Sequence, residues 1–237
     1  MKKVLRDSGL RTGRLVDIGC GHGYFLSWAR AAGWEVVGID YPSLATKYAQ
    51  ERLGLHIIEA DLSEALREMS LGVGTFDVVT LWHCLEHAAD PPLVLQDAAS
   101  LLKDQGVLLI AVPNGVCPGM NCKREDWVWC QEPYVHTVHF TPTSLTMLIR
   151  KARLRPLSIW SRDTWDANHL FDMHLKVWVQ KWSGQLRNIN EQAGFWFEEA
   201  SRLFCYAFGG VRHWCLGLEC LPEMGSELLV FADKDVV

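Results

Sequence analysis

The stretch LVDIGCGHGYF, residues 15–25, joins three patterns that are typical of one supersecondary unit. Its first residues form an apolar run of the kind found in buried parallel strands. Glycines follow at positions 19, 21 and 23, and then comes a helical pattern that contains Trp28 and Ala29. Glycine adopts positive φ and lets a ligand approach the backbone, and a helix start presents unpaired N–H groups. The stretch predicts a strand, a ligand-binding turn and a helix in direct succession.

Short β-rich runs alternate with helical patterns along the rest of the chain, which indicates an α/β fold with a mostly parallel sheet. One helix is predicted after Asp90 and another after Thr141, because each of these N-cap residues precedes a proline. The predicted strands are residues 14–18, 35–39, 55–59, 76–82, 106–112, 156–160 and 227–232.

Acidic residues end the second and third predicted strands. Asp40 can accept hydrogen bonds from both hydroxyls of a ribose. Asp61 can accept one from an adenine amino group, and Leu62 offers a backbone N–H to the ring. Open α/β sheets bind ligands at the carboxyl ends of their strands, where these residues and the glycines fall. The sequence therefore predicts a nucleotide-like ligand.

The glycine spacing separates two classes of such ligand. A dinucleotide site requires GxGxxG, whose third glycine allows close helix packing, but this chain has GCGHGY with Tyr24 at that position. The spacing disfavours a pyrophosphate and leaves an NAD-dependent oxidoreductase as the less favoured alternative.

The composition indicates a single domain, residues 1–237, of which 49% are hydrophobic. The net charge of −5 gives no broad attraction to nucleic acid. The first residues carry charges where a secretory signal needs an apolar run, and no stretch is long and apolar enough to cross a bilayer. Eight scattered cysteines fit free thiols, so we expect a cytoplasmic protein.

Residues 163–224 interrupt the alternating pattern with an aromatic-rich helical insertion before the last strand. Apolar side chains recur at helical spacing in it, as in the run from Phe171 to Trp182. Such stripes are usually buried core. A substrate lid, a homodimer face and a peripheral membrane contact stay open as alternatives.

The successive motifs resemble those of class I S-adenosylmethionine (SAM)-dependent methyltransferases. The segments that carry the resemblance are LVDIGCGHGYF, VVGIDYPS, IIEADL, FDVVTLWHCLEHAADP and LLKDQGVLLIAVPN. The likeness covers about residues 14–162 and the last strand, and within the superfamily it points to the branch of ubiquinone-pathway O-methyltransferases and bacterial sugar and natural-product methyltransferases. It implies a Rossmann-like seven-stranded sheet in the order 3-2-1-4-5-7-6 with the last strand antiparallel.

The resemblance also implies a role for individual residues. Asp17 and the three glycines would hold the methionine part of SAM, and Asp40 the ribose. The complete implied cofactor set is Asp17, Gly19, Gly21, Gly23, Asp40, Tyr41, Asp61, Leu62, Trp82 and His83, with Tyr41 over one adenine face, Asp61 and Leu62 at the adenine edge, and Trp82 and His83 beneath the sulfonium. The family usually has further helices before the first strand, so we expect the 163–224 insertion to enclose the acceptor.

The predicted function is methyl transfer from SAM to a small-molecule acceptor, with a hydroxyl of a sugar, a quinone-like compound or a natural product as the expected target. A hydroxyl must lose its proton, and histidine is suited to accept it near neutral pH. His136 is the first candidate because the resembling branch usually has histidine there, and His139 and His83 are the others.

Two alternatives use the same residues differently. Enzymes of this branch bind a divalent ion through Glu-x-x-Glu-His, and this chain has His83, Glu86 and His87 in the matching run. A carboxylate with imidazoles would suit zinc better than magnesium. The chain could also be a non-catalytic SAM-binding scaffold, although its intact glycine turn and aspartates argue against that.

Overall fold

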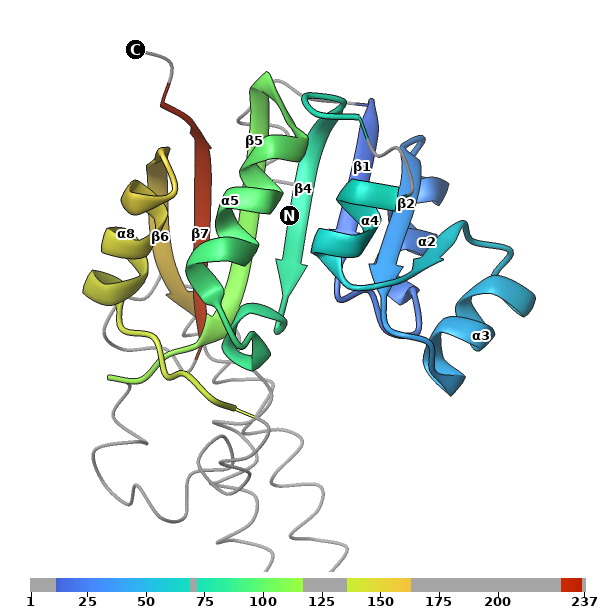
Figure 1. Cartoon of the computed structure of the whole chain (residues 1–237), viewed down its shortest axis with the longest axis horizontal. Helices are drawn as coiled ribbons and strands as arrows, with labels where there is room; N and C mark the ends of the chain where they lie inside the picture. Colours follow the sequence, from blue (N-terminus) through green and yellow to red (C-terminus); the bar gives the residue numbers. More distant parts are fainter. Residues whose placement is uncertain (1–11, 69–71, 117–135, 163–226, 236–237) are drawn as a thin grey trace, which may run out of the picture.

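A computed structural model describes residues 12–68, 72–116, 136–162 and 227–235. Their strands form one seven-stranded sheet in the order β3-β2-β1-β4-β5-β7-β6 (Figure 1). The strands are β1 (Arg14–Ile18), β2 (Glu35–Asp40), β3 (Ile57–Glu59), β4 (Phe76–Trp82), β5 (Leu102–Pro113), β6 (Leu154–Arg162) and β7 (Glu227–Lys234).

The strand directions confirm the predicted topology. Strands β1 to β5 pair in parallel with their neighbours, whereas β7 runs antiparallel to both β5 and β6. The largest boundary difference from the prediction is at β5, which begins at Leu102 and not at residue 106. The other strand bounds agree with the predictions to within two residues. Leu102 pairs with Phe76, and the register then shifts before Val78 pairs with Val107. The polar residues in that irregular segment conceal the strand in the sequence pattern.

Helices cover both faces of the sheet. The elements are α2 (Tyr24–Ala31), α3 (Leu44–Glu51), α4 (Leu62–Glu68), the 3₁₀ turn η1 (Leu85–His87), α5 (Pro91–Leu101) and α8 (Pro142–Lys151). Helices α4, α5 and α8 lie on the face turned toward the viewer in Figure 1 and bury one apolar cluster. Helices α2 and α3 bury a second cluster on the opposite face. This three-layer packing leaves the strand ends free for the connecting loops.

The predicted starts of α5 and α8 are confirmed by their caps. Asp90 Oδ1 accepts a hydrogen bond from Leu93 N at 3.1 Å. Thr141 Oγ1 accepts one from Ser144 N at 3.0 Å, and Thr141 N donates back to Ser144 Oγ at 2.8 Å. Each cap satisfies backbone groups that a helix start leaves unpaired, and a proline follows it in both helices.

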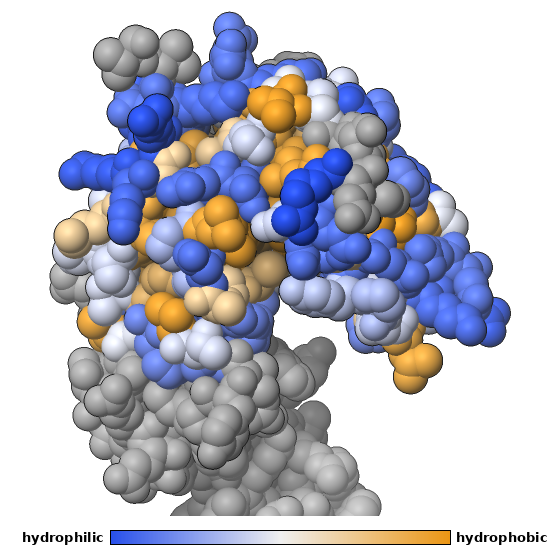
Figure 2. Space-filling view, viewed as in Figure 1, coloured by the Kyte–Doolittle hydropathy of each residue, from blue (hydrophilic) through white to orange (hydrophobic). Residues whose placement is uncertain are grey.

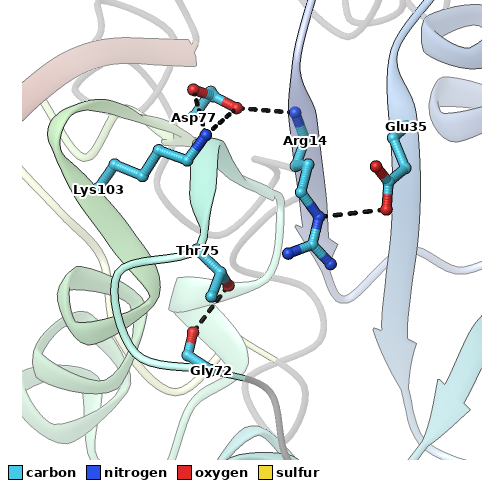
Figure 3. Close-up of polar contacts among 6 residues, drawn as sticks. All are labelled: Arg14, Glu35, Gly72, Thr75, Asp77 and Lys103. Carbon is cyan, nitrogen blue, oxygen red and sulfur yellow. Dashed lines mark hydrogen bonds and ion pairs between the residues drawn. The ribbon is translucent and has the colours of Figure 1, made fainter.

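Asp77 connects the amino-terminal ends of three strands, at the end of the sheet opposite the glycine turn. Its Oδ2 accepts a hydrogen bond from Arg14 N of β1 at 2.8 Å (Figure 3). Its two oxygens lie 2.8 and 2.9 Å from Lys103 Nζ of β5. These bonds hold the pKa of Asp77 below its ordinary value against the opposing effect of burial. The cluster is a structural tie between β1, β4 and β5.

The outer surface over α5 and α8 mixes hydrophilic side chains with smaller hydrophobic patches (Figure 2). Within the described ranges, no helix is long and apolar enough to cross a membrane. The 163–224 insertion lies outside those ranges, and its role stays a prediction.

Truncation of Leu108 is expected to test the core. Leu108 of β5 is fully buried, so Leu108→Ala should lower the free energy of unfolding by about 2–5 kcal/mol through the cavity that it leaves. Urea titration monitored by circular dichroism measures this loss. Leu157 of β6 is 50% exposed, and Leu157→Ala should cost less than about 0.5 kcal/mol. Equal losses in the two variants would contradict the described packing.

Candidate functional site

The turn between β1 and α2 is built on glycines in the left-handed backbone region. Gly19, Gly21 and Gly23 have φ angles of 73°, 52° and 71°. A side-chain carbon at Gly19 would lie 2.8 Å from the Cys84 sulfur, whereas one at Gly21 would meet nothing within 4 Å. Packing against the loop after β4 therefore requires Gly19, and the backbone at Gly21 faces open space in which a ligand can lie.

Asp40, the last residue of β2, is fixed against this turn by two backbone hydrogen bonds. Its Oδ2 accepts from Gly21 N and its Oδ1 from Tyr41 N, both at 2.7 Å. Asp40 is only half-buried, so its remaining lone pairs can accept hydrogen bonds from hydroxyl groups. The Tyr41 ring is 66% exposed beside it. The structure therefore brings Asp40, the residue predicted to bind a ribose, into contact with the glycine turn.

Asp61 directly precedes α4, and Leu62 is the first residue of that helix. Asp61 Oδ1 accepts a hydrogen bond from Glu64 N at 2.7 Å and so caps the helix. Asp61 and Glu64 have the spacing of a capping box, a signal that the sequence analysis did not use. The Leu62 side chain is buried in the core, which leaves its backbone for the predicted contact with an adenine edge.

Asp17 of β1 is buried at the base of the glycine turn. Only 2% of its surface is exposed, and its Oδ1 accepts a hydrogen bond from Thr80 Oγ1 of β4 at 2.6 Å. Burial raises the pKa of Asp17 to about 7, with a further rise from the charge of Asp40, and the Thr80 hydrogen bond opposes the shift. Asp17 can therefore exchange a proton near neutral pH beside the open backbone.

Trp82 ends β4 and packs into the core beside α2. Its ring centroid lies 5.4 Å from that of Phe25, and the ring packs on a small cluster of Val107, Leu109 and Phe231. Within the described ranges, its buried Nε1 has no hydrogen-bond partner. The predicted contact between Trp82 and a sulfonium stays a prediction.

His83 follows β4 directly and is held by two buried carboxylates. Its Nδ1 lies 3.3 Å from Glu86 Oε1, and its Nε2 lies 2.5 Å from Glu227 Oε1 at the start of β7. Burial lowers the pKa of His83, but the hydrogen bonds and charges of Glu227 and Glu86 outweigh burial and raise it to about 9. Both ring nitrogens therefore carry protons at neutral pH, which argues against the prediction of His83 as a general base.

Glu86, His87 and His136 form a cluster with ligand-type atoms within 4.8 Å of one another. Glu86 and His136 are buried and His87 is exposed. The ring centroids of His87 and His136 are 4.7 Å apart. The main chain explains this approach, because Glu86 O accepts a hydrogen bond from Thr137 N at 3.0 Å. The potential metal ligands thus differ from the predicted set: His136 takes the place of His83, which turns to Glu227.

His139, the third predicted base, lies outside this cluster in the described structure. It is half-buried, and its Cβ would lie 3.5 Å from a side-chain carbon built at Gly115 after β5. Of the three candidate bases, His136 is the one that joins Glu86 and His87 in this cluster of described residues, whereas His83 contacts Glu86 from outside it.

The site has two halves. The glycine turn and Asp40 offer backbone and carboxylate groups to a polar, hydroxyl-bearing ligand. The loop after β4 and the segment before α8 offer histidines and a buried carboxylate. Contact between Gly19 and Cys84 joins the two halves.

Replacement of Asp17 by asparagine is expected to stabilise the fold at neutral and higher pH. The pKa of Asp17 is about 7 in the folded chain, against an ordinary value of 3.8. Protonated Asp17 therefore favours the folded chain fully below pH 3.8, and this stabilisation is lost as the pH rises to about 7. Asparagine has no such loss. The gap in unfolding free energy between Asp17→Asn and wild type should grow over that window to roughly 2–4 kcal/mol and then level off. Urea titrations at several pH values measure it, and a gap that does not change with pH would contradict the assignment.

Comparisons with known proteins point to one family for this chain. A family model described as a methyltransferase domain matches residues 2–159. A ubiquinone biosynthesis O-methyltransferase of Haemophilus ducreyi is 34% identical over 113 residues, 45% of this chain and 48% of that protein. Its counterpart in Caulobacter vibrioides is 35% identical over 105 residues, 42% of this chain and 40% of that protein. The chain thus spans about half the length of these curated relatives, or less.

Solved structures share the fold at low sequence identity. A SAM-dependent methyltransferase of Archaeoglobus fulgidus aligns with a TM-score of 0.59 and 18% identity over 98% of this chain and 92% of that chain. One from Mesorhizobium loti aligns with a TM-score of 0.58 and 16% identity over 98% and 96%. Because the family model covers well over half of its length, the chain belongs to the methyltransferase domain family.

Proposed function

We propose that the protein transfers the methyl group of SAM to a hydroxyl of a small-molecule acceptor. The observation that carries the proposal is the hydrogen bond from Gly21 N to Asp40 Oδ2. It holds a carboxylate that can accept hydrogen bonds from ribose hydroxyls beside backbone that a ligand can approach. The names of the relatives from Haemophilus and Caulobacter support an oxygen acceptor, over less than half of each of those proteins.

The residues at the strand ends fit SAM. Gly21 leaves room for the cofactor, and Asp40 can accept hydrogen bonds from ribose hydroxyls. Asp61, which we expect at the adenine edge, is held in place by its hydrogen bond from Glu64 N. Asp17 offers a buried carboxylate to the positive groups of the methionine part. Bound SAM supplies a methyl group on a sulfonium, which is already activated for displacement. The task left to the protein is to align the acceptor and to accept its proton.

Cofactor binding tests the proposal without knowledge of the acceptor. Isothermal titration calorimetry should show binding of S-adenosylhomocysteine and not of NAD. Asp40→Ala should weaken the S-adenosylhomocysteine affinity at least about tenfold, because it removes hydrogen bonds to a charged acceptor. Asp104 is 88% exposed at its side chain, and Asp104→Ala serves as the matched control with unchanged affinity. Tight NAD binding, or full affinity in Asp40→Ala, would overturn the assignment.

His136 is the proposed base for the acceptor hydroxyl. It is buried beside Glu86 and His87 in the half of the site that the loop after β4 and the segment before α8 form, which we call the acceptor half. His136→Ala should lower turnover about 10²–10⁴-fold and leave the S-adenosylhomocysteine affinity unchanged. The rate is measured with the acceptor that a panel of hydroxylated sugars, phenols and quinols identifies. His56 is exposed before β3, and His56→Ala is the control. An unaffected rate in His136→Ala would transfer the role to His139.

A metal-assisted form of this reaction is the second candidate. It is favoured by the cluster of Glu86, His87 and His136, in which the buried Oε2 of Glu86 has no hydrogen-bond partner in the part of the chain that the structure describes. Two imidazoles and a carboxylate suit zinc. A divalent ion held there would lower the pKa of an acceptor hydroxyl, and His136 would then be a ligand and not the base.

A further inference from the structure

Three ionisable side chains form a line near the carboxyl ends of the strands. Glu227 begins β7, His83 follows β4, and Glu86 lies in η1. Strand β5 separates β4 from β7, so the His83 side chain reaches across β5 near its carboxyl end to meet Glu227. Both carboxylates are buried, with 0% and 1% of their side chains exposed, whereas the His83 side chain is 32% exposed.

Backbone hydrogen bonds fix two members of this line to the sheet. Glu227 pairs with Pro113 of β5 on one side and with Arg162 of β6 on the other. His83 N donates to Ala111 O at 2.9 Å and extends the pairing of β4 with β5. The sheet therefore sets the distance between Glu227 and His83, and His83 in turn sets the position of Glu86.

The backbone of His83 carries strain that its side-chain contacts offset. Its φ angle is +48°, in a region that disfavours residues with a Cβ atom. The imidazole nitrogens meet Glu86 and Glu227, so the left-handed backbone directs the ring between the two carboxyl groups. Without the ring, each buried carboxyl group would lose a hydrogen-bond partner, which is unfavourable for a buried polar group.

Glu86 is left with one engaged oxygen and one buried oxygen. Its Oε1 contacts His83, and its Oε2 has no hydrogen-bond partner among the described residues. Glu86 is also the member of the His87 and His136 cluster that lies in the deepest position, with no exposed surface. A single free oxygen in a fixed position is what a metal ligand requires.

We propose that His83 and Glu227 are positioning residues that hold the Glu86 carboxylate for a divalent metal ion bound with His87 and His136. The inference rests on the metal-assisted form of the proposed function. In it His83 is not a ligand, because both of its nitrogens face carboxylates. The chain has thus replaced one carboxylate of the resembling motif by an imidazole that orients the other.

Zinc titration of the full-length protein tests this assignment. Calorimetry with Zn²⁺ should show a site in the wild type that His87→Ala removes. Glu227→Gln and His83→Asn should weaken Zn²⁺ binding about 10–100-fold, as removal of a partner that orients a metal ligand does. Asparagine is chosen because it tolerates the left-handed backbone. Asp77→Asn breaks an ion pair at the opposite edge of the sheet and should leave Zn²⁺ binding unchanged.

The sign of the His83→Asn effect tests the positioning role directly. Loss of the contact that orients the Glu86 carboxyl group should weaken cation binding. Tighter or unchanged Zn²⁺ binding in His83→Asn, with unchanged binding in Glu227→Gln, would overturn the positioning role. An equal loss in Asp77→Asn would assign the effect to fold stability and also overturn it. A wild type that binds S-adenosylhomocysteine but neither Zn²⁺ nor Mn²⁺ would remove the metal and this inference, and would leave the methyl-transfer proposal standing.

Discussion

The hydrogen bond from Gly21 N to Asp40 Oδ2 is the interaction on which the cofactor half of the site depends. It exists because β1 and β2 pair in parallel and end side by side, so that the turn after one strand meets the last residue of the other. A right-handed crossover through α2 is what returns the chain to this place. The geometry of the ligand contact is thus a consequence of strand pairing, and the side chains only complete it.

Local sequence signals are sufficient for this half and for two helix starts elsewhere. The glycines, Asp40 and the caps at Asp90 and Thr141 each lie within a few residues of the structure that they specify, and the structure has them where the sequence predicts. The start of β5 was missed because its first residues are polar and its ladder is irregular there. Periodicity detects a strand only where alternate side chains enter an apolar layer.

The acceptor half could not be predicted in the same way. His83 and Glu227 lie 144 positions apart, and no pattern around either residue indicates the other. For the same reason, the sequence predicts His83 as the partner of Glu86 and His87 where the structure has His136. A hydrogen bond between Glu86 and the segment before α8 brings His136 to this position. Contacts of this kind depend on the assembled sheet, and a motif can suggest the residue types but not which of them meet.

The position of β7 between β5 and β6 has a consequence for how the protein is made. Among the described strands, β6 pairs only with β7, which follows it in the chain after a long intervening segment. The part of the sheet from β3 to β5 can pair as its strands are made, whereas β6 must wait until β7 has been synthesised. Such non-local pairing slows folding and leaves an unpaired strand edge exposed in the nascent protein. Helper proteins that shield strand edges should therefore matter most between the synthesis of β6 and that of β7.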